Sequence, residues 1–271
     1  MRNFVISLSS ATLRRAHISS EFAKEKVDFE FFDAITPVTL QATSSAIGLV
    51  TKQTDLHQHE VACLLSHVVL WKKAVDEQLD YIAIFEDDIY LGKQAVSYLT
   101  NVAWIPSFCG IIKLETLNKK IQLPKMQSII PLHLNRKLML LGEPHMGAGG
   151  YILSLNVAKE LLEYVLRSPK LIPIDHILFR EFPESSGEKI FQLSPAICIQ
   201  DVILTKGKTN FPSSLENVRN ARKGEDKSKK KLTLLGKMKR EMSRLILQVH
   251  VFFQERIQSI KGKALINIQF K

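Results

Sequence analysis

Three consecutive carboxylates, Glu86, Asp87 and Asp88, lie near the end of an apolar run of β-branched, aromatic and small residues at 80–90. Such a run is typical of a buried strand. Three adjacent negative charges repel one another and are costly to hold together without a counter-charge. Hard carboxylate oxygens suit Mg²⁺ or Mn²⁺, and open α/β sheets place ligands at the carboxyl ends of strands. The motif indicates a divalent-cation site, although a solvated acidic turn fits the motif alone equally well.

Other charged side chains follow predicted elements in the same way. Asp175 follows a proline and apolar residues at 172–176, where it fits either a general base or a helix N-cap. Lys113 and Glu115 end a predicted strand at 110–115, and they either face the same site or pair with each other. Asp201 ends the last strand-like segment, at 193–201.

The first element of the chain predicts a phosphate site. A strand at 4–8, which includes Ser7 and Leu8, is followed by a helix expected over 11–26, with Ser9-Ser10 as its cap. Free backbone N–H groups at a helix start, with Arg14 and Arg15 close by, suit a phosphate group. The alternative is that both arginines are solvated helix charges.

The remaining pattern alternates strands and helices, which predicts an α/β fold. His67 lies on the apolar face of the helix at 59–74 and fits a core residue better than a ligand. Gly149, Gly150 and Tyr151 belong to a small-residue loop that runs into a strand and lets backbone approach a ligand. We expect a strand at 29–34, a long loop at 36–56, helices at 59–74, 93–101 and 156–167 (the last capped by Asn156), and a hairpin within 117–140.

The charge of the chain is unevenly distributed. Its 271 residues carry a net charge of +10, but residues 219–271 contain 15 Lys/Arg against 4 Asp/Glu. The rest holds 22 basic and 23 acidic residues, so the body is near neutral and nucleic-acid binding is disfavoured. We therefore divide the chain into a catalytic domain at 1–218 and a basic tail at 219–271. Three cysteines without a CxxC pair fit buried thiols in a reducing compartment.

Apolar residues recur at helical spacing in the tail, beside a cluster of lysines and arginines. This pattern predicts an amphipathic basic helix on an anionic membrane surface. The alternative is a helix that packs on the body or on a second copy of the chain, as a homodimer. The first residues are too short and too soon polar for a signal peptide, and no window is long and apolar enough to span a membrane.

Several segments, in this order, resemble the family 25 glycosyltransferases, the bacterial lipooligosaccharide galactosyl- and glucosyltransferases. Together they cover residues 2–205, and the Glu…Cys…Ser-His block about twenty residues before Glu-Asp-Asp is the most specific piece. His59 and Ala62 stand where the family pattern has glycines. The matching segments are residues 5–8 with 14–15, 32–35, 60–67, 84–88, 112–115, 149–154 and 173–175.

The resemblance implies a GT-A-like nucleotide-binding sheet flanked by helices, with Mn²⁺ or Mg²⁺ bound to a UDP-sugar donor. It implies Asp88 as a metal ligand, with Glu86 and Asp87 in support and Asp201 as a weaker candidate. Asp175 is the implied base. The implied donor-binding residues are Ser7, Leu8, Arg14, Arg15, Lys113 and Glu115, and the implied acceptor- or sugar-binding residues are Gly149, Gly150 and Tyr151.

The first hypothesis is therefore an inverting, metal-dependent hexosyltransferase that extends lipooligosaccharide, with UDP-galactose favoured as the donor. A lipid-linked acceptor places it in the cytoplasm, peripheral on the inner membrane. The alternative is a catalytically inactive sugar-nucleotide-fold protein that binds or scaffolds at the membrane surface. A basic nucleic-acid-binding protein is a distant third reading, because the body is near neutral.

Overall fold

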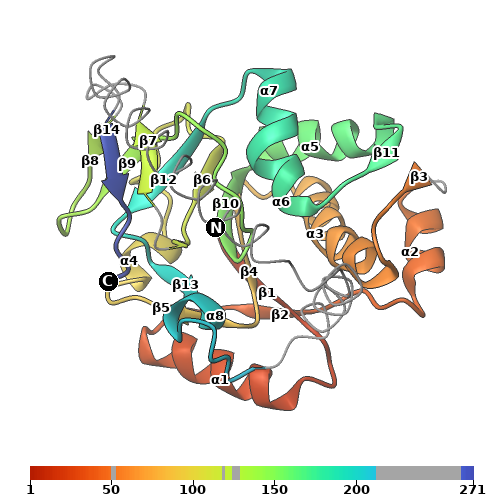
Figure 1. The fold of residues 1–271 in the computed structure, drawn as a ribbon, viewed down its shortest axis with the longest axis horizontal. Helices are drawn as coiled ribbons and strands as arrows, with labels where there is room; N and C mark the ends of the chain where they lie inside the picture. Colours follow the sequence, from red (N-terminus) through yellow and green to blue (C-terminus); the bar gives the residue numbers. More distant parts are fainter. Residues whose placement is uncertain (50–52, 118–119, 124–128, 212–263) are drawn as a thin grey trace, which may run out of the picture.

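The protein is an α/β fold built on a mixed eight-stranded sheet, seen here in a computed structural model (Figure 1). The structure describes residues 1–49, 53–117, 120–123, 129–211 and 264–271. The sheet order is β2-β1-β4-β10-β6-β12-β9-β8. Its strands are β1 (Arg2–Ser7), β2 (Glu30–Asp33), β4 (Tyr81–Glu86), β6 (Ile111–Lys113), β8 (Ile129–Pro131), β9 (Lys137–Leu140), β10 (Gly150–Ser154) and β12 (Ile190–Ser194).

The direction of the strands decides where side chains meet. β1 is parallel to β2 and β4, with Ile6 opposite Glu86, whereas β10 is antiparallel to β4 and β6. β12 is again parallel to β6. The carboxyl ends of β1, β2, β4 and β6 and the beginning of β10 therefore lie along one edge of the sheet.

Alternate residues of the central strands enter two separate cores, as a period of two requires. On one face, Ile84 and Tyr151 pack with residues of α3 (Gln58–Asp76) and α5 (Leu155–Arg167). On the other face, Phe85 and Ile152 pack with residues of α1 (Thr12–Lys24) and α4 (Val96–Leu99). In Figure 1, α1 accordingly lies on the far side of the sheet from α3 and α5.

The helix predicted at 59–74 is confirmed as α3, which begins with a capping box between His57 and Glu60. Its apolar residues recur around most of the helix, because both the sheet and α5 pack on it. After α5 the chain continues through a short α6 (Ile174–His176), a π-helical turn η2 (Ile177–Glu181), α7 (Phe182–Ser186) and α8 (Asp201–Leu204).

Four local predictions were wrong. The expected loop at 36–56 contains α2 (Leu40–Ala46) and β3 (Gln53–Thr54), because Leu40 and Leu49 anchor this polar stretch on the core. α1 begins at Thr12 after Ala11, without a side-chain cap from the two serines. The cap of α5 is Ser154, whose Oγ accepts from Val157 N, rather than Asn156. The helix at 93–101 is reduced to the four residues of α4.

Three small two-stranded sheets flank the main one in the part of the chain that the structure describes. They pair β3 with β11 (Lys170–Leu171), β5 (Ile89–Leu91) with β13 (Cys198–Gln200), and β7 (Lys120–Leu123) with β14 (Ala264–Asn267). The hairpin expected within 117–140 is confirmed as β8 and β9. No helix within the described ranges combines the length and the apolar character that a membrane crossing requires.

The end of the basic tail belongs to the folded body. β14 pairs antiparallel with β7 (Figure 1). Ile268 is fully buried, and Thr116 Oγ1 donates to the Ile268 carbonyl at 2.7 Å. Arg136 Nη2 donates to the Lys271 carbonyl at 3.0 Å. The predicted amphipathic helix lies outside the described residues.

Candidate functional site

A pocket of about 450 Å³ opens at the edge where β1, β2 and β4 end. Its walls come from the β1–α1 turn, the residues after β2, the first three turns of α3 and the acidic cluster at the end of β4. Asn210 and Phe211, at the end of the described body, complete it. Its lining includes Ser7, Leu8, Arg14, Cys63, His67, Glu86, Asp87, Asp88, Asn210 and Phe211.

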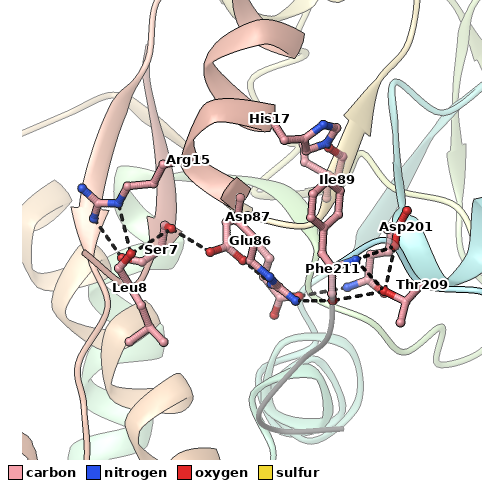
Figure 2. A network of polar contacts seen from close by, with 12 residues as sticks. Ser7, Leu8, Arg15, His17, Glu86, Asp87, Ile89, Asp201, Thr209 and Phe211 are labelled. Carbon is pink, nitrogen blue, oxygen red and sulfur yellow. Dashed lines mark hydrogen bonds and ion pairs between the residues drawn. The ribbon is translucent and has the colours of Figure 1, made fainter. Parts of the chain in front are cut away.

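Asp87 is the acidic residue whose charge is already balanced. Its Oδ2 accepts from Ser7 Oγ at 2.7 Å, and its Oδ1 accepts from Arg14 Nη1 at 2.5 Å (Figure 2). Both side chains of the ion pair are largely buried, with 17% of Arg14 and 11% of Asp87 exposed. Arg14 also donates to the Phe211 carbonyl at 2.8 Å, so it connects the acidic cluster to the far wall of the pocket.

Glu86 and Asp88 carry the uncompensated charge. Burial first, and then the neighbouring carboxylates with Asp88 foremost among them, together raise the pKa of Glu86 to about 8. Burial also raises the pKa of Asp88 to about 6, against the lowering influence of Arg14. Asp88 Oδ1 is buried and has no hydrogen-bond partner among the described residues. A buried, unpaired oxygen among carboxylates fits a divalent cation, which supplies the missing positive charge and accepts oxygen ligands.

Asp201 organises the wall that Asn210 and Phe211 form. Its Oδ2 accepts from Thr209 Oγ1 at 2.8 Å and from Asn210 N at 2.6 Å, and its Oδ1 accepts from Asn210 Nδ2 at 2.9 Å (Figure 2). Burial on its own would raise the pKa of Asp201, but these hydrogen bonds lower it below its ordinary value. Both carboxylate oxygens of Asp201 thus accept hydrogen bonds within the protein. A metal ion bound by Asp201, as predicted, would have to displace these hydrogen bonds.

Lys113 and Glu115 pair with each other, the second of the two alternatives considered for them. Neither has exposed surface, and Lys113 Nζ donates to Glu115 Oε1 at 2.7 Å. Lys113 also donates to the Gly147 carbonyl and lies 4.3 Å above the Phe179 ring. Glu115 Oε2 is left without a hydrogen-bond partner among the described residues. The pair is internal to the fold and lines no part of the pocket.

Gly149 and Gly150, where β10 begins, leave room for neighbouring side chains of the fold. A Cβ on Gly149 would meet Glu115 Oε2 at 2.7 Å and Gln200 Nε2 at 2.8 Å, and one on Gly150 would meet Cys198 Sγ at 2.4 Å. Such distances are far below normal contact. The close approach predicted for this loop is confirmed, but the approaching groups are protein side chains instead of a ligand.

The position of Tyr151 disagrees with the expectation that it binds the acceptor or a sugar. It has no exposed surface, and its hydroxyl contacts His67 Nδ1 at 2.8 Å and Trp71 Nε1 at 3.0 Å. The strand alternation turns it into the core beneath α3 instead of toward a sugar. His67 is confirmed as a buried residue, and burial lowers its pKa to about 3.

Asp175 and Arg15 lie outside the pocket lining. Asp175 Oδ2 accepts from Gly147 N at 3.3 Å, and its Oδ1 accepts from His176 N at 3.0 Å. Asp175 is close enough to Glu86 for its charge to act on that carboxyl. Arg15 holds the corner after β1 by donating to the Leu8 and Ser7 carbonyls (Figure 2). It also donates to Asp33.

The structure thus brings Ser7, Leu8, Arg14 and the acidic cluster into one pocket. It adds Asn210 and Phe211, which sequence reasoning missed. The signal was weak, because nothing local marks residues 209–211 as the hydrogen-bond donors of an aspartate eight to ten positions earlier. His17, also missed, contacts the Ile89 carbonyl at 2.8 Å and packs against the Phe211 ring.

The chain is similar to known glycosyltransferases and lipooligosaccharide biosynthesis proteins. A family model described as Glycosyltransferase family 25 (LPS biosynthesis protein) matches residues 1–178. The Lipooligosaccharide biosynthesis protein lex-1 of Haemophilus influenzae is 30% identical over 98% of this chain and 98% of its own length. Two Lacto-N-neotetraose biosynthesis glycosyltransferases of Neisseria meningitidis serogroup B are also similar. LgtE is 32% identical over 90% of both chains, and LgtB is 36% identical over 76% of this chain and 78% of its own.

Among solved structures, a glycosyltransferase involved in the glycosylation of the major capsid of PBCV-1 aligns with a TM-score of 0.41. The two chains are 7% identical, over 74% of this chain and 93% of that one. A similarity at this level carries no conclusion for the present fold.

Proposed function

Because this chain belongs to glycosyltransferase family 25, it is a glycosyltransferase, and we propose that it extends lipooligosaccharide with a hexose from a UDP-sugar. Galactose is the favoured sugar. The similar proteins named for lipooligosaccharide and lacto-N-neotetraose biosynthesis support the acceptor class. The parallel β2–β1–β4 arrangement, with carboxylates at the end of β4, supports a GT-A-like assignment.

The observation that carries the proposal is the unpaired Asp88 Oδ1 among carboxylates in a pocket beside a strand-to-helix turn. Asp88 would hold Mn²⁺ or Mg²⁺ directly. Glu86, and Asp87 through its pair with Arg14, would support it. Such a cation supplies Lewis-acid stabilisation of the charge that develops on the departing diphosphate.

Ser7, Leu8 and Arg14 would contact the nucleotide from the β1–α1 turn. Arg14 is the cation of this turn in the pocket lining, so it would also lie closest to the phosphates. Asn210 and Phe211 would close the opposite wall. Arg15, Lys113, Glu115 and Asp201 would act indirectly, by holding the backbone that presents these groups.

Asp175 would serve as the general base of an inverting transfer. An acceptor hydroxyl would attack the anomeric carbon of the hexose as the bond from that carbon to the diphosphate oxygen breaks. The carboxylate would take the hydroxyl proton, and the configuration would invert. Among the described residues its two oxygens accept from the backbone N–H groups of Gly147, at 3.3 Å, and of the adjacent His176, so it keeps acceptor capacity for a hydroxyl.

The cellular location stays a proposal. A lipid-linked acceptor would suit a protein on the cytoplasmic face of the inner membrane, with basic residues of 219–263 toward anionic lipid. Sedimentation of the full chain with anionic vesicles, and not with neutral ones, would support this location.

The central test measures hydrolysis and transfer across a panel of UDP-sugars with Mn²⁺ and then with EDTA. Wild type should turn over one UDP-hexose only with metal, and Asp88→Asn should lose roughly a hundredfold or more in rate. Asp76→Asn, which removes an exposed carboxylate on α3, is the matched control. If every donor stays intact while one binds, the inactive binding-protein alternative replaces the enzyme.

A further inference from the structure

Three different metal-ligand types converge at the floor of the pocket. Cys63 and His67 lie one helical turn apart on α3, so they share a face of that helix, and Glu86 ends β4 opposite them. One ligand atom from each of the three lies within 4.8 Å of the other two. All three residues line the pocket, so an ion can reach them from solvent.

His67 gives a second, independent observation. The imidazole is fully buried, and its Nε2 has no hydrogen-bond partner among the described residues. This nitrogen lies 4.0 Å from Glu86 Oε1, too far for a hydrogen bond. A buried polar nitrogen left in this way is costly, and a cation between the two groups would satisfy both.

The surrounding contacts hold the ligands in place. His67 Nδ1 contacts the Tyr151 hydroxyl at 2.8 Å, and that hydroxyl also accepts from Trp71 Nε1 at 3.0 Å. With its proton on Nδ1, the ring donates to Tyr151 and directs the Nε2 lone pair toward Glu86. Glu86 Oε2 accepts from Gln200 Nε2 at 2.9 Å, which leaves Oε1 for the ion. Outer partners of this kind orient histidine and carboxylate ligands in metal sites.

The ligand chemistry selects the ion. Thiolate, imidazole and carboxylate together suit Zn²⁺ and not the hard cations Mg²⁺ or Mn²⁺. Bonds of about 2.0–2.3 Å to a tetrahedral Zn²⁺ place its ligands about 3.5 Å apart, within reach of side-chain rotation from the present separations.

We propose that Cys63, His67 and Glu86 form a Zn²⁺ site with a fourth position open to the pocket, separate from the hard-cation role of Asp88. Binding requires Cys63 to release its proton to solvent and Glu86 to be ionised. Zn²⁺ binding can be measured without any sugar, so the test of this site is separate from the test of the transfer reaction.

The test uses Co²⁺ as a spectroscopic substitute for Zn²⁺ on the full chain. Wild type should develop a thiolate-to-cobalt charge-transfer band in the near ultraviolet, and Zn²⁺ should abolish it. Cys63→Ser should lose the band and bind Zn²⁺ at least about tenfold more weakly, measured by competition with a chromophoric chelator. Cys109→Ala, at a buried thiol in the opposite core, should keep both properties.

Two further variants distinguish the Zn²⁺ site from the acidic cluster. His67→Asn, checked for folding by circular dichroism, should weaken Zn²⁺ binding as Cys63→Ser does, whereas Asp88→Asn should leave the charge-transfer band unchanged. Absence of the band in wild type would overturn the site. So would its persistence in a folded Cys63→Ser variant. Loss of the band in a folded Asp88→Asn variant would overturn the separate site as well, because it would show that Asp88 shares the ion.

Discussion

Arg14 on α1 forms an ion pair with Asp87, 73 positions later in the chain, at the end of β4. The pair explains why three adjacent carboxylates are tolerated: one is neutralised by Arg14 and receives a hydrogen bond from Ser7. The remaining two, Glu86 and Asp88, keep raised pKa values and face the pocket. Asp87 is therefore the supporting carboxylate, and Glu86 and Asp88 are the two that remain for interaction with a cation.

Breaking this pair should destabilise the fold. Arg14→Gln leaves Asp87 partly buried without its counter-charge, so we expect a loss of about 1–3 kcal/mol in the free energy of unfolding. Urea denaturation measures it. In combination with Asp87→Asn the loss should be smaller than the sum of the single variants. Lys72→Gln, which breaks the exposed pair with Asp76, should cost less than about 1 kcal/mol. Strict additivity would contradict a direct interaction.

The metal-free protein should lose stability as the pH rises from 6.5 to 8. Glu86 holds its proton in the folded state up to a pKa of about 8, while the unfolded chain releases it near 4.5. The folded state therefore binds more protons in this interval, and stability falls by up to about 1 kcal/mol per pH unit. His67, whose folded pKa of about 3 lies below its ordinary 6.5, acts in the opposite sense, and this effect fades as the pH rises above 6.5.

Urea denaturation in EDTA at several pH values checks this slope. Glu86→Gln should flatten it, whereas Asp76→Asn, at an exposed carboxylate of α3, should keep it. Excess Mn²⁺ should reduce or reverse the slope, because the cation binds the ionised carboxylates. A slope that is unchanged in Glu86→Gln would show that another group titrates.

Asp201 should control the donor pocket through the residues that it holds. Asp201→Asn cannot accept hydrogen bonds from Thr209 and Asn210 in the same way, so we expect a loss of about 1–3 kcal/mol in the free energy of unfolding. Donor binding, measured by calorimetry with UDP, should weaken as well, because Asn210 and Phe211 line the pocket. Thr209→Val should reproduce a smaller part of both effects.

The matched control is Thr205→Val. Thr205 Oγ1 donates to the backbone carbonyl of Asp201 and not to its carboxylate, so donor binding should stay nearly unchanged. If Thr209→Val leaves donor binding intact while Asp201→Asn abolishes metal binding, Asp201 acts as a metal ligand instead of an anchor.

The end of the chain should contribute to the stability of the body. Ile268 is fully buried beside Ile121, Met139 and Ala196, so Ile268→Ala should cost about 2–5 kcal/mol in the free energy of unfolding. Asn267→Ala, at the exposed neighbour in β14, should cost well under 1 kcal/mol. Thermal or urea denaturation of both variants decides the matter. Equal, small losses would mean that residues 264–271 are not docked in solution.

The sequence alone was sufficient for the elements with strong local patterns. The apolar run before Glu86 predicts β4, and the helical spacing at 59–74 predicts α3, because burial of one face imposes its period on the residues. It was also sufficient to place Ser7, Arg14 and the carboxylates at one edge. A strand followed directly by a helix, and a strand that ends in acidic residues, have few other arrangements in an α/β fold.

Tertiary structure decided which of these charged groups are already paired. Arg14 pairs with Asp87, and Asp201 pairs with residues 209–211, across separations that no local period encodes. Lys113 and Glu115 share a face because they are two positions apart, but only the packing around them buries the pair. The same holds for Tyr151. Alternation along β10 says that its neighbours face the other side of the sheet, but only the position of α3 made its own side the core. The direction of a side chain follows from the local backbone geometry. Its neighbours depend on packing between segments that are distant in the sequence.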